Sequence, residues 1–449
     1  MKINEVIGIN LGKNMDQLLG QPNPAIIFKN ARRFFNIEDI YKDKDGNGVT
    51  PASGKVKTYP DLSCDNLVPD PSDGWQSYHD SYKRYNCDYH KFDHEIYAFQ
   101  YIAPDGPEHM RFFPANNVDP KELGATSRKQ TINSFQMADI VKQGFRANEI
   151  EANEHWRPGY IPTYKAMQKG FFMAQDDDFK VNSQALQFLH TDEGNPMFHN
   201  YGPDYLTPDE LSQTNALTIH PYGFKNGQGG KPEDLIGRPE HEIYQNLKKL
   251  KEFRDANAPQ AKMYVTEIGW NSEISGEQNQ AEYLIISLLL AMDLGYSKFH
   301  IYELIDRPKN GLFNSCGLGK IVDGKYVAKE SYYILKDFLE QYGEYTVGKV
   351  YQIDREWSVD LIPPTGDEII VVSWSEDESG LVFEKVSDIE QHVEDVLNGV
   401  TMKEEEVIVL QTAIGILTNQ DIMKYDSEKL VDKAIEISKL ILKKTNYGK

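Results

Sequence analysis

The chain has 449 residues, 40% of them apolar and 11% aromatic, so it can build a core for one large domain and a smaller one and is not of the disordered class. Its 69 acidic residues outnumber its 48 basic ones, for a formal net charge of −21. This balance opposes binding to nucleic acid or to an anionic membrane surface, and neither is expected as a partner.

Strand-like apolar runs recur along the first three hundred residues. There are eight of them: EVIGIN (5–10), ARRFFNI (31–37), EIYAFQYI (95–102), NEIEAN (148–153), FKVNSQALQF (179–188), ALTIHPYG (216–223), KMYVTEIGW (262–270) and KFHIYELI (298–305). Amphipathic stretches of helical length lie between several of the runs, at 134–145, 160–175, 240–256 and 278–295. Alternating strands and helices of this number predict a parallel sheet closed into a (β/α)8 barrel.

A short acidic turn interrupts this series near its start. The sequence DKDGNG, Asp43 to Gly48, matches the first half of a calcium loop of the EF-hand type. Position twelve of such a loop is Gly54 here, so the bidentate glutamate is missing, and a turn rich in Asp, Asn and Gly is the alternative. No His or Cys cluster has zinc-site spacing, and we expect no metal site.

The C-terminal quarter of the chain changes character after the barrel, which we predict to span 1–343. Short alternating runs with turn signals between them predict a small antiparallel β unit at 344–386. Apolar residues at helical spacing then predict a helical tail at 387–449. The tail's apolar faces need a partner, which is either the chain's own barrel or, in an assembly or docking role, another protein or a second copy of the chain.

Cysteine usage and the N-terminus say little about location. Cys64, Cys87 and Cys316 are an odd number and cannot define a disulfide framework, so reduced thiols are expected. The N-terminal segment has no apolar core of signal-peptide length, and no apolar stretch reaches membrane-spanning length. Localisation stays open: either the protein stays where it is made, a signal has been removed, or the protein leaves by another route.

Two glutamates stand where the predicted fourth and seventh strands end. Glu154 follows Asn153 after the run NEIEAN, and Glu267 lies in TEIGW, where Gly269 interrupts the strand. Active sites of β/α barrels lie at these strand ends, and glycoside cleavage needs one carboxyl that gives up a proton and one that stays ionised. Asn153 can donate a hydrogen bond to a sugar hydroxyl. The alternative for each glutamate is a solvated surface position.

At these motifs the chain resembles the clan A glycoside hydrolases, and most closely the family 39-like β-glycosidases, over about residues 5–340. The resemblance implies that Glu154 is the acid/base and Glu267 the nucleophile. It further implies that His220 and Tyr222, in LTIHPYG, belong to the site after strand six, and that Arg33 braces the nucleophile from strand two.

The chain also departs from the pattern of these relatives. His155 follows the acid/base where a proline is common, and strand eight carries Tyr302 and Glu303 where many relatives have a tryptophan. The second departure concerns the floor of the sugar site, and we place Tyr302 there.

The supporting residues have alternatives of their own. His220 can be a strand-end histidine bonded to backbone, Tyr222 can be a packing residue, and Arg33 can form a surface ion pair. Trp270 either lines the sugar site with its aromatic face or is wedged between helices.

The sequence therefore predicts a retaining glycoside hydrolase that acts on a β-linked oligosaccharide or polysaccharide and needs no cofactor. The alternative is a catalytically degenerate barrel that serves as a carbohydrate-binding or structural protein in a larger assembly, such as a virion. Sugar and linkage specificity, exo or endo action and oligomeric state are left open.

Overall fold

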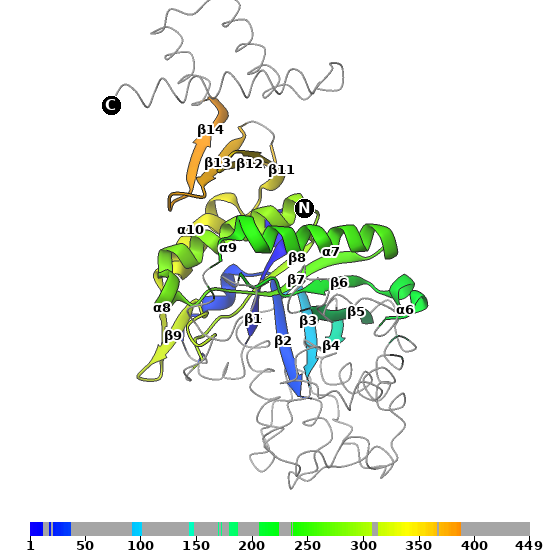
Figure 1. Cartoon of the computed structure of the whole chain (residues 1–449). Coiled ribbons are helices and arrows are strands. Elements are labelled where there is room, and N and C mark those ends of the chain that lie inside the picture. The colour runs from blue at the N-terminus through cyan, green and yellow to red at the C-terminus, as the bar shows by residue number, and fades with distance from the viewer. Residues whose placement is uncertain are drawn as a thin grey trace, which may run out of the picture. The chain divides into compact units, whose positions relative to one another are not determined.

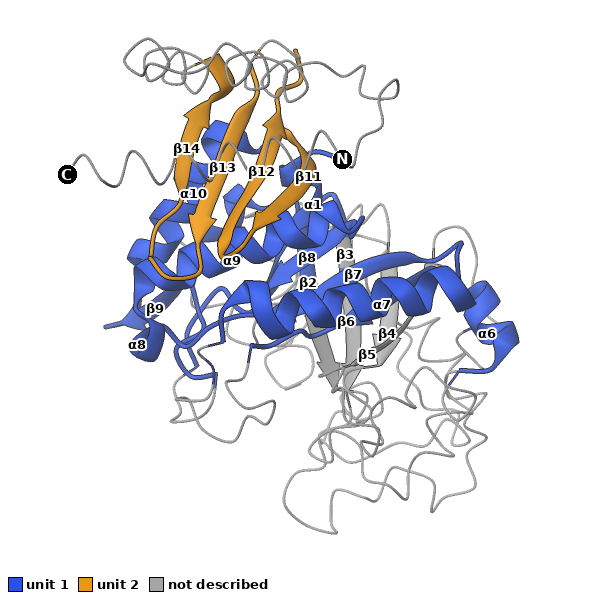
Figure 2. Ribbon diagram, turned by 45° about the horizontal axis from the view of Figure 1, so that its top comes forward, with its two compact units in different colours: residues 1–344 blue, residues 345–449 orange. Residues whose placement is uncertain are grey.

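The structure is a computed structural model that describes residues 1–11, 18, 21–36, 92–100, 143–147, 169, 172, 179–186, 206–223, 235, 237–307, 313–365 and 368–387. The chain divides into two compact units, Met1–Glu344 and Tyr345–Lys449 (Figure 2). The Asp43–Gly48 turn and almost all of the predicted helical tail lie outside the described residues.

The first unit is built on eight parallel strands that pair in chain order, with β8 pairing back to β1 to close the barrel (Figure 1). The strands are β1 (Ile7–Leu11), β2 (Asn30–Asn36), β3 (His94–Gln100), β4 (Gln143–Ala147), β5 (Phe179–Leu186), β6 (Ala216–Ile219), β7 (Lys262–Ile268) and β8 (Lys298–Ile301). All residues of β1 and β6 are buried, which explains why these strands show continuous apolar runs and little alternation.

The fourth strand differs from its prediction. It runs from Gln143 to Ala147, within and just after the stretch predicted as a helix, whereas the sequence pattern favoured 148–153. Its pairing with β3 and β5 sets its position, because Gln143 pairs with both Glu95 and Phe179. Glu154 therefore lies seven residues beyond the end of β4, outside the described residues.

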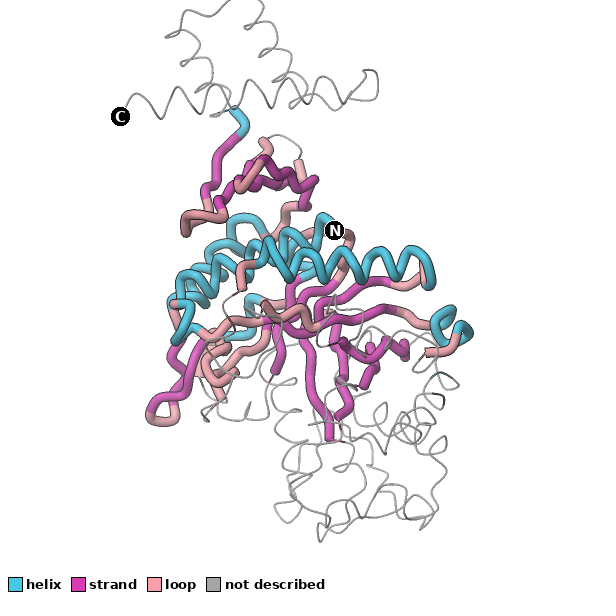
Figure 3. The backbone as a smooth tube through the Cα atoms, in the orientation of Figure 1, coloured by secondary structure: helices cyan, strands magenta, loops and turns pink. Residues whose placement is uncertain are grey.

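Helices flank the later strands of the barrel (Figure 3). After β6 come η11 (Pro239–Ile243) and α7 (Tyr244–Asn257), and after β7 come α8 (Ser272–Ser275) and α9 (Glu277–Asp293). Helix α10 (Glu330–Tyr342) follows a hairpin of β9 (Gly319–Val322) and β10 (Lys325–Ala328). Helix α7 contacts β6 and β7, and α9 contacts β8, α7 and α10. Because α9 is enclosed by these elements, apolar residues occupy most of its surface, among them Leu284, Ile285, Leu288 and Leu289.

The remaining elements of this unit are short. They are α1 (Ile3–Val6), η2 (Pro24–Ile27), α6 (Pro208–Gln213), β9 (Gly319–Val322) and β10 (Lys325–Ala328). Helix α6 begins with a capping box in which the Thr207 side chain accepts from the Glu210 backbone and the Glu210 side chain accepts from the Thr207 backbone. This cap fixes the chain just before β6, which carries two site residues at its end.

The second unit contains an antiparallel sheet in the order β11 (Thr346–Ile353), β12 (Glu356–Ile362), β13 (Ile370–Ser375) and β14 (Val382–Lys385). Alternate residues of β12 and β13 are buried, as expected for a sheet with one covered face. Trp357 and Trp374 pair across these strands and stack, with ring centroids 6.2 Å apart. In the part of the chain described here, no helix is both long and apolar enough to cross a membrane.

Candidate active site

Glu267, next to last in β7, is buried, and both of its carboxylate oxygens are engaged. Arg32 donates from Nη1 to Oε1 at 2.5 Å, and the Tyr222 hydroxyl donates to Oε2 at 2.8 Å. His220 lies with Nδ1 3.5 Å from Oε2. The guanidinium is fully buried and permanently charged, so it compensates the charge of a carboxylate that would otherwise be costly to bury.

Four strands position this carboxylate. Glu267 comes from β7 and Arg32 from β2, while His220 and Tyr222 follow directly after β6, where the Tyr222 N–H donates to the His220 carbonyl at 3.0 Å. Asn10 of β1 accepts from Arg32 Nη1 at 2.6 Å. Its Nδ2 donates to backbone carbonyls of β7 and β8, those of Thr266 and Ile301, at 3.0 Å each.

Asn10 was not predicted as a site residue, although the sequence held a signal for it. It is the one polar side chain in the buried strand IGINL, and a buried amide needs hydrogen-bond partners. In the structure Asn10 links the Arg32 guanidinium to the backbone of β7 and β8 through hydrogen bonds.

Within the described side chains, the arginine that contacts Glu267 is Arg32, whereas the prediction from the sequence was its neighbour Arg33. Side-chain direction depends on the register of the strand, so a motif with two adjacent arginines does not say which of them meets Glu267. The Arg33 side chain lies outside the described part of the structure.

An aromatic wall adjoins the carboxylate. The Tyr222 ring packs against Phe313 with centroids 4.7 Å apart and meets Tyr302 edge-on at 6.3 Å. Tyr302 follows β8, is 3% exposed and carries the Arg307 guanidinium 4.9 Å from its ring centroid. A Cβ at Gly269 would collide with the Tyr302 carbonyl oxygen, so only glycine lets the chain after β7 pass this close to the chain after β8.

Trp270 fits the packing alternative better than the sugar-lining one. Its side chain is fully buried, its Nε1 donates to the Gly237 carbonyl at 3.0 Å, and its ring meets Tyr283 of α9 at 5.5 Å. Its backbone carbonyl also accepts from Gln280 at 2.8 Å. Trp270 therefore anchors the chain after β7 to α9 and to the segment before η11.

Glu303, directly after Tyr302, is a second buried carboxyl that the sequence pattern did not mark as a site residue. Arg307 donates from Nε to its Oε1 at 2.8 Å. Burial, and then the negative charges of Glu267 and Asp306, raise the pKa of Glu303 well above its ordinary value. Two carboxyls near each other thus stand in different environments, since a buried arginine contacts Glu267 while the arginine at Glu303 is half-exposed.

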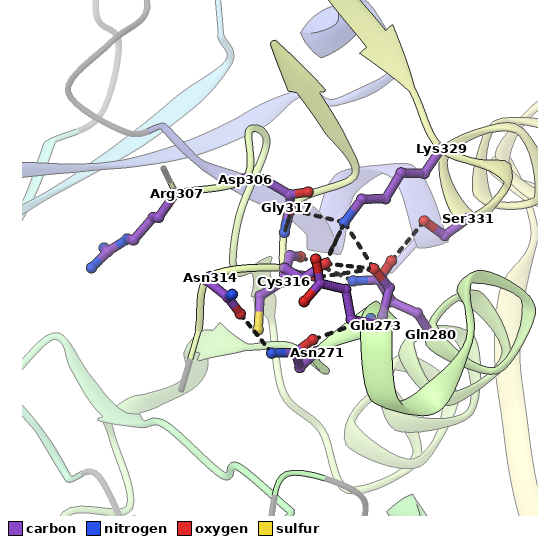
Figure 4. Close-up of polar contacts among 12 residues, drawn as sticks. Asn271, Glu273, Gln280, Asp306, Arg307, Asn314, Cys316, Gly317, Lys329 and Ser331 are labelled. Carbon is purple, nitrogen blue, oxygen red and sulfur yellow. Dashed lines mark hydrogen bonds and ion pairs between the residues drawn. The ribbon is translucent and has the colours of Figure 1, made fainter. Parts of the chain in front are cut away.

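A buried lysine holds the segment after β8 in place (Figure 4). Lys329 Nζ donates to Asp306 Oδ1 at 2.7 Å, to the Ser272 hydroxyl at 2.8 Å and to the Ser315 carbonyl at 3.1 Å. The same Asp306 oxygen accepts from the Gly317 N–H at 2.9 Å. Burial is the main cause that raises the pKa of Asp306, and Lys329 opposes it. These contacts join the chain after β7, the chain after β8 and the start of α10.

Comparison with known proteins gives a result at the level of fold. No protein-family model matches the chain, and no curated protein matches it in sequence. A solved family 39 glycoside hydrolase from the gut symbiont Bacteroides cellulosilyticus WH2 matches in structure with a TM-score of 0.54 at 15% identity, over 84% of this chain and 72% of that one. The chain has the fold of the clan A glycoside hydrolases. The resemblance predicted from the motifs is confirmed to that extent.

Two further solved structures match with TM-scores below 0.5. SrfJ from Salmonella typhimurium is 12% identical over 86% of this chain and 87% of that one, with a TM-score of 0.49. A GH5_18 protein from Bifidobacterium longum subsp. infantis is 13% identical over 76% of this chain and 80% of that one, with a TM-score of 0.48.

The structure brings some of the predicted site residues together and does not describe others. Glu267, His220 and Tyr222 lie together, Tyr302 packs against Tyr222, and Trp270 is fully buried against Tyr283 of α9. Asn153 and Glu154 lie outside the described residues. Among the described residues, no group of three or more His, Cys, Asp or Glu side chains could hold a metal ion.

Proposed function

We propose that this protein is a retaining glycoside hydrolase that acts on β-linked sugars. The observation that carries the proposal is the setting of Glu267: a buried carboxylate at the end of β7, compensated by Arg32 and hydrogen-bonded by Tyr222, in a barrel with a family 39 glycoside hydrolase fold. A surface glutamate would have neither a buried cation nor a buried hydroxyl donor.

In the first half of the reaction, Glu267 attacks the anomeric carbon of the sugar. A bond forms between a carboxylate oxygen and that carbon while the bond to the leaving oxygen breaks, and Glu154 gives its proton to that oxygen. The product of this step is a glycosyl ester on Glu267. Arg32 and Tyr222 serve the step by holding the carboxylate in one orientation, so that little reorganisation is needed when it reacts.

In the second half, water attacks the same carbon and the ester bond breaks. Glu154, now ionised, takes a proton from the water, and Glu267 returns as a carboxylate. Two inversions at one carbon leave its configuration unchanged. The roles of Glu154 and Asn153 rest on the sequence motif, and the mechanism requires the two carboxyls to lie roughly 5 Å apart.

Retention and the nucleophile can be tested together. The purified protein is incubated with 4-nitrophenyl β-glycosides of glucose, galactose, mannose and xylose, and the first-formed anomer is identified by proton NMR. A β-configured product supports the mechanism, whereas an α-configured first product contradicts it.

The attacking residue can be located with a 2-deoxy-2-fluoro glycoside of a good leaving group, which slows the breakdown of the ester. We expect a covalent adduct on the peptide that contains Glu267, detected by mass spectrometry. Glu267→Gln should form none and should lower kcat at least about 10³-fold. Glu252→Gln, the same chemical change on the exposed face of α7, is the matched control and should behave as wild type. An adduct on another residue would overturn the assignment.

A further inference from the structure

Glu303 is a buried carboxyl that the proposed mechanism does not use. It lies two residues beyond the end of β8 and is 3% exposed. Its backbone is fixed on both sides, because its N–H donates to the Cys316 carbonyl at 3.3 Å and its carbonyl accepts from the Leu318 N–H at 3.0 Å. The direction of this side chain is therefore determined by the fold.

The contacts of the carboxyl leave part of it unused. Arg307 donates to Oε1 through Nε alone, and within the described chain no other donor reaches the Glu303 carboxyl. The Arg307 side chain is 50% exposed, and its other polar contacts in the same part of the chain are made by its backbone. Among the described residues, one carboxyl oxygen and the outer guanidinium nitrogens are thus not used by these hydrogen bonds.

This pair is close to the proposed nucleophile. The charge of Glu267 acts on the Glu303 carboxyl. The Arg307 guanidinium lies over the Tyr302 ring, Tyr302 meets Tyr222 edge-on, and Tyr222 donates to Glu267. The two carboxyls therefore border the same aromatic wall.

The segment that carries the pair is held rigidly. Asp306, between the two residues of the pair, is clamped by Lys329 and by the Gly317 N–H (Figure 4). The Arg307 N–H donates to the Asn314 carbonyl at 3.0 Å, and the Asn314 side chain accepts from Asn271 at 2.7 Å. A recognition site needs such support, because side chains with free rotamers hold a ligand poorly.

A purely structural ion pair explains these features less well. One hydrogen bond to a half-exposed arginine compensates little of the cost of burying a carboxyl, and such pairs add little stability. A ligand hydroxyl that donates to the carboxyl would supply what is missing.

We propose that Glu303 and Arg307 form a recognition pair for neighbouring hydroxyl groups of the sugar that binds beside Glu267. The carboxyl accepts a hydrogen bond from one hydroxyl, and the guanidinium donates to the oxygen of the next. The ligand class is a neutral pyranoside with two adjacent free hydroxyls. This inference rests on the proposed function, since it assigns a sugar to the same site.

The kinetic test compares Glu303→Gln and Arg307→Met with wild type on the four 4-nitrophenyl β-glycosides. We expect kcat/KM on the best substrate to fall about 10- to 100-fold in each variant, mainly through a higher KM, because each substitution removes or weakens a hydrogen bond to the sugar. The four sugars differ in the configuration of one hydroxyl or in the presence of one hydroxymethyl group. The ratio between the highest and the lowest of their kcat/KM values should be smaller in each variant than in wild type. If kcat/KM and the order of preference among the four sugars are the same in both variants as in wild type, the proposed recognition pair is refuted.

The matched control is Glu340→Gln. Glu340 pairs with Lys336 at the same four-residue spacing, but on the exposed side of α10. It should leave all four kcat/KM values within about two-fold of wild type. Far-UV circular dichroism of each variant checks that the fold is retained.

A binding measurement separates this inference from the proposed function. The methyl β-glycosides of the same sugars are titrated into wild type and into each variant, and binding is followed by saturation-transfer NMR. Turnover by wild type with unaltered kinetics and binding in the variants would overturn the pair and leave the hydrolase intact. Binding that is lost in Glu303→Gln and Arg307→Met, without turnover in wild type, would support the pair and reject the hydrolase. Absence of binding to wild type would overturn the pair.

Discussion

The contact between Arg32 and Glu267 gives a sharp prediction about stability. Both side chains are buried, so removing one partner leaves the other charge without compensation. Breaking a buried pair in this way costs about 3–5 kcal/mol, a large part of a total unfolding free energy of about 5–15 kcal/mol. We expect Arg32→Met, which keeps most of the side-chain volume, to lower the unfolding free energy by that amount at pH 7.

A double-mutant cycle isolates the contact from other effects of the substitutions. Arg32→Met, Glu267→Gln and the double variant are unfolded in urea and followed by far-UV circular dichroism. The double variant should be more stable than the sum of the single effects predicts, with a coupling of about 2 kcal/mol or more.

Arg33→Met is the control, since the sequence motif favoured Arg33 and the structure places Arg32 against Glu267. Its effect should add to that of Glu267→Gln within about 0.5 kcal/mol, as for independent sites. Coupling to Arg33, or additivity at Arg32, would refute the assignment of the brace.

Three further predictions concern the site. Tyr222→Phe removes the hydroxyl that donates to Glu267 and keeps the ring, so kcat/KM should fall about 10- to 150-fold with the fold intact, and unchanged steady-state kinetics would contradict the contact. Glu154→Gln should retain more turnover on 2,4-dinitrophenyl than on methyl glycosides, because a good leaving group needs little protonation, and equal losses would count against its acid role. The pKa of Glu303 is raised above 4.5 in the folded state, so the unfolding free energy should fall as pH rises from about 4.5 through the raised value. Glu303→Gln should remove that pH dependence. The unfolding free energies of wild type and variant are measured in urea between pH 4 and 8, and a difference between them that stays constant over this range would refute the prediction.

The location of Glu267 at a strand end was accessible from local sequence. The run KMYVTEI is apolar and β-forming, and Gly269 follows where the chain must pass close to Tyr302, so the end of β7 could be recognised without a partner strand. The same holds for His220 and Tyr222, which directly follow the short buried strand ALTI. Their contacts with Glu267 follow from the barrel, in which the ends of neighbouring parallel strands meet.

The fourth strand shows where local pattern was insufficient. The apolar and polar residues of 143–153 are compatible with a strand at either end, and the structure places it at Gln143–Ala147 through pairing with β3 and β5. The register of a strand is set by its pairing with the neighbouring strands, so it cannot be read from the sequence of one segment.

By itself, the sequence indicated a series of strands alternating with helices and a glutamate at the end of the strand Lys262–Ile268, because hydrophobic period and glycine position act over a few residues. Only the tertiary structure decided that Arg32 contacts Glu267, that Trp270 packs against α9, and that Glu303 is held by the segment around Cys316 and Leu318. The physical reason is common to all three. Which face of a strand a side chain takes, and which distant segment buries it, depends on contacts between residues far apart in the chain.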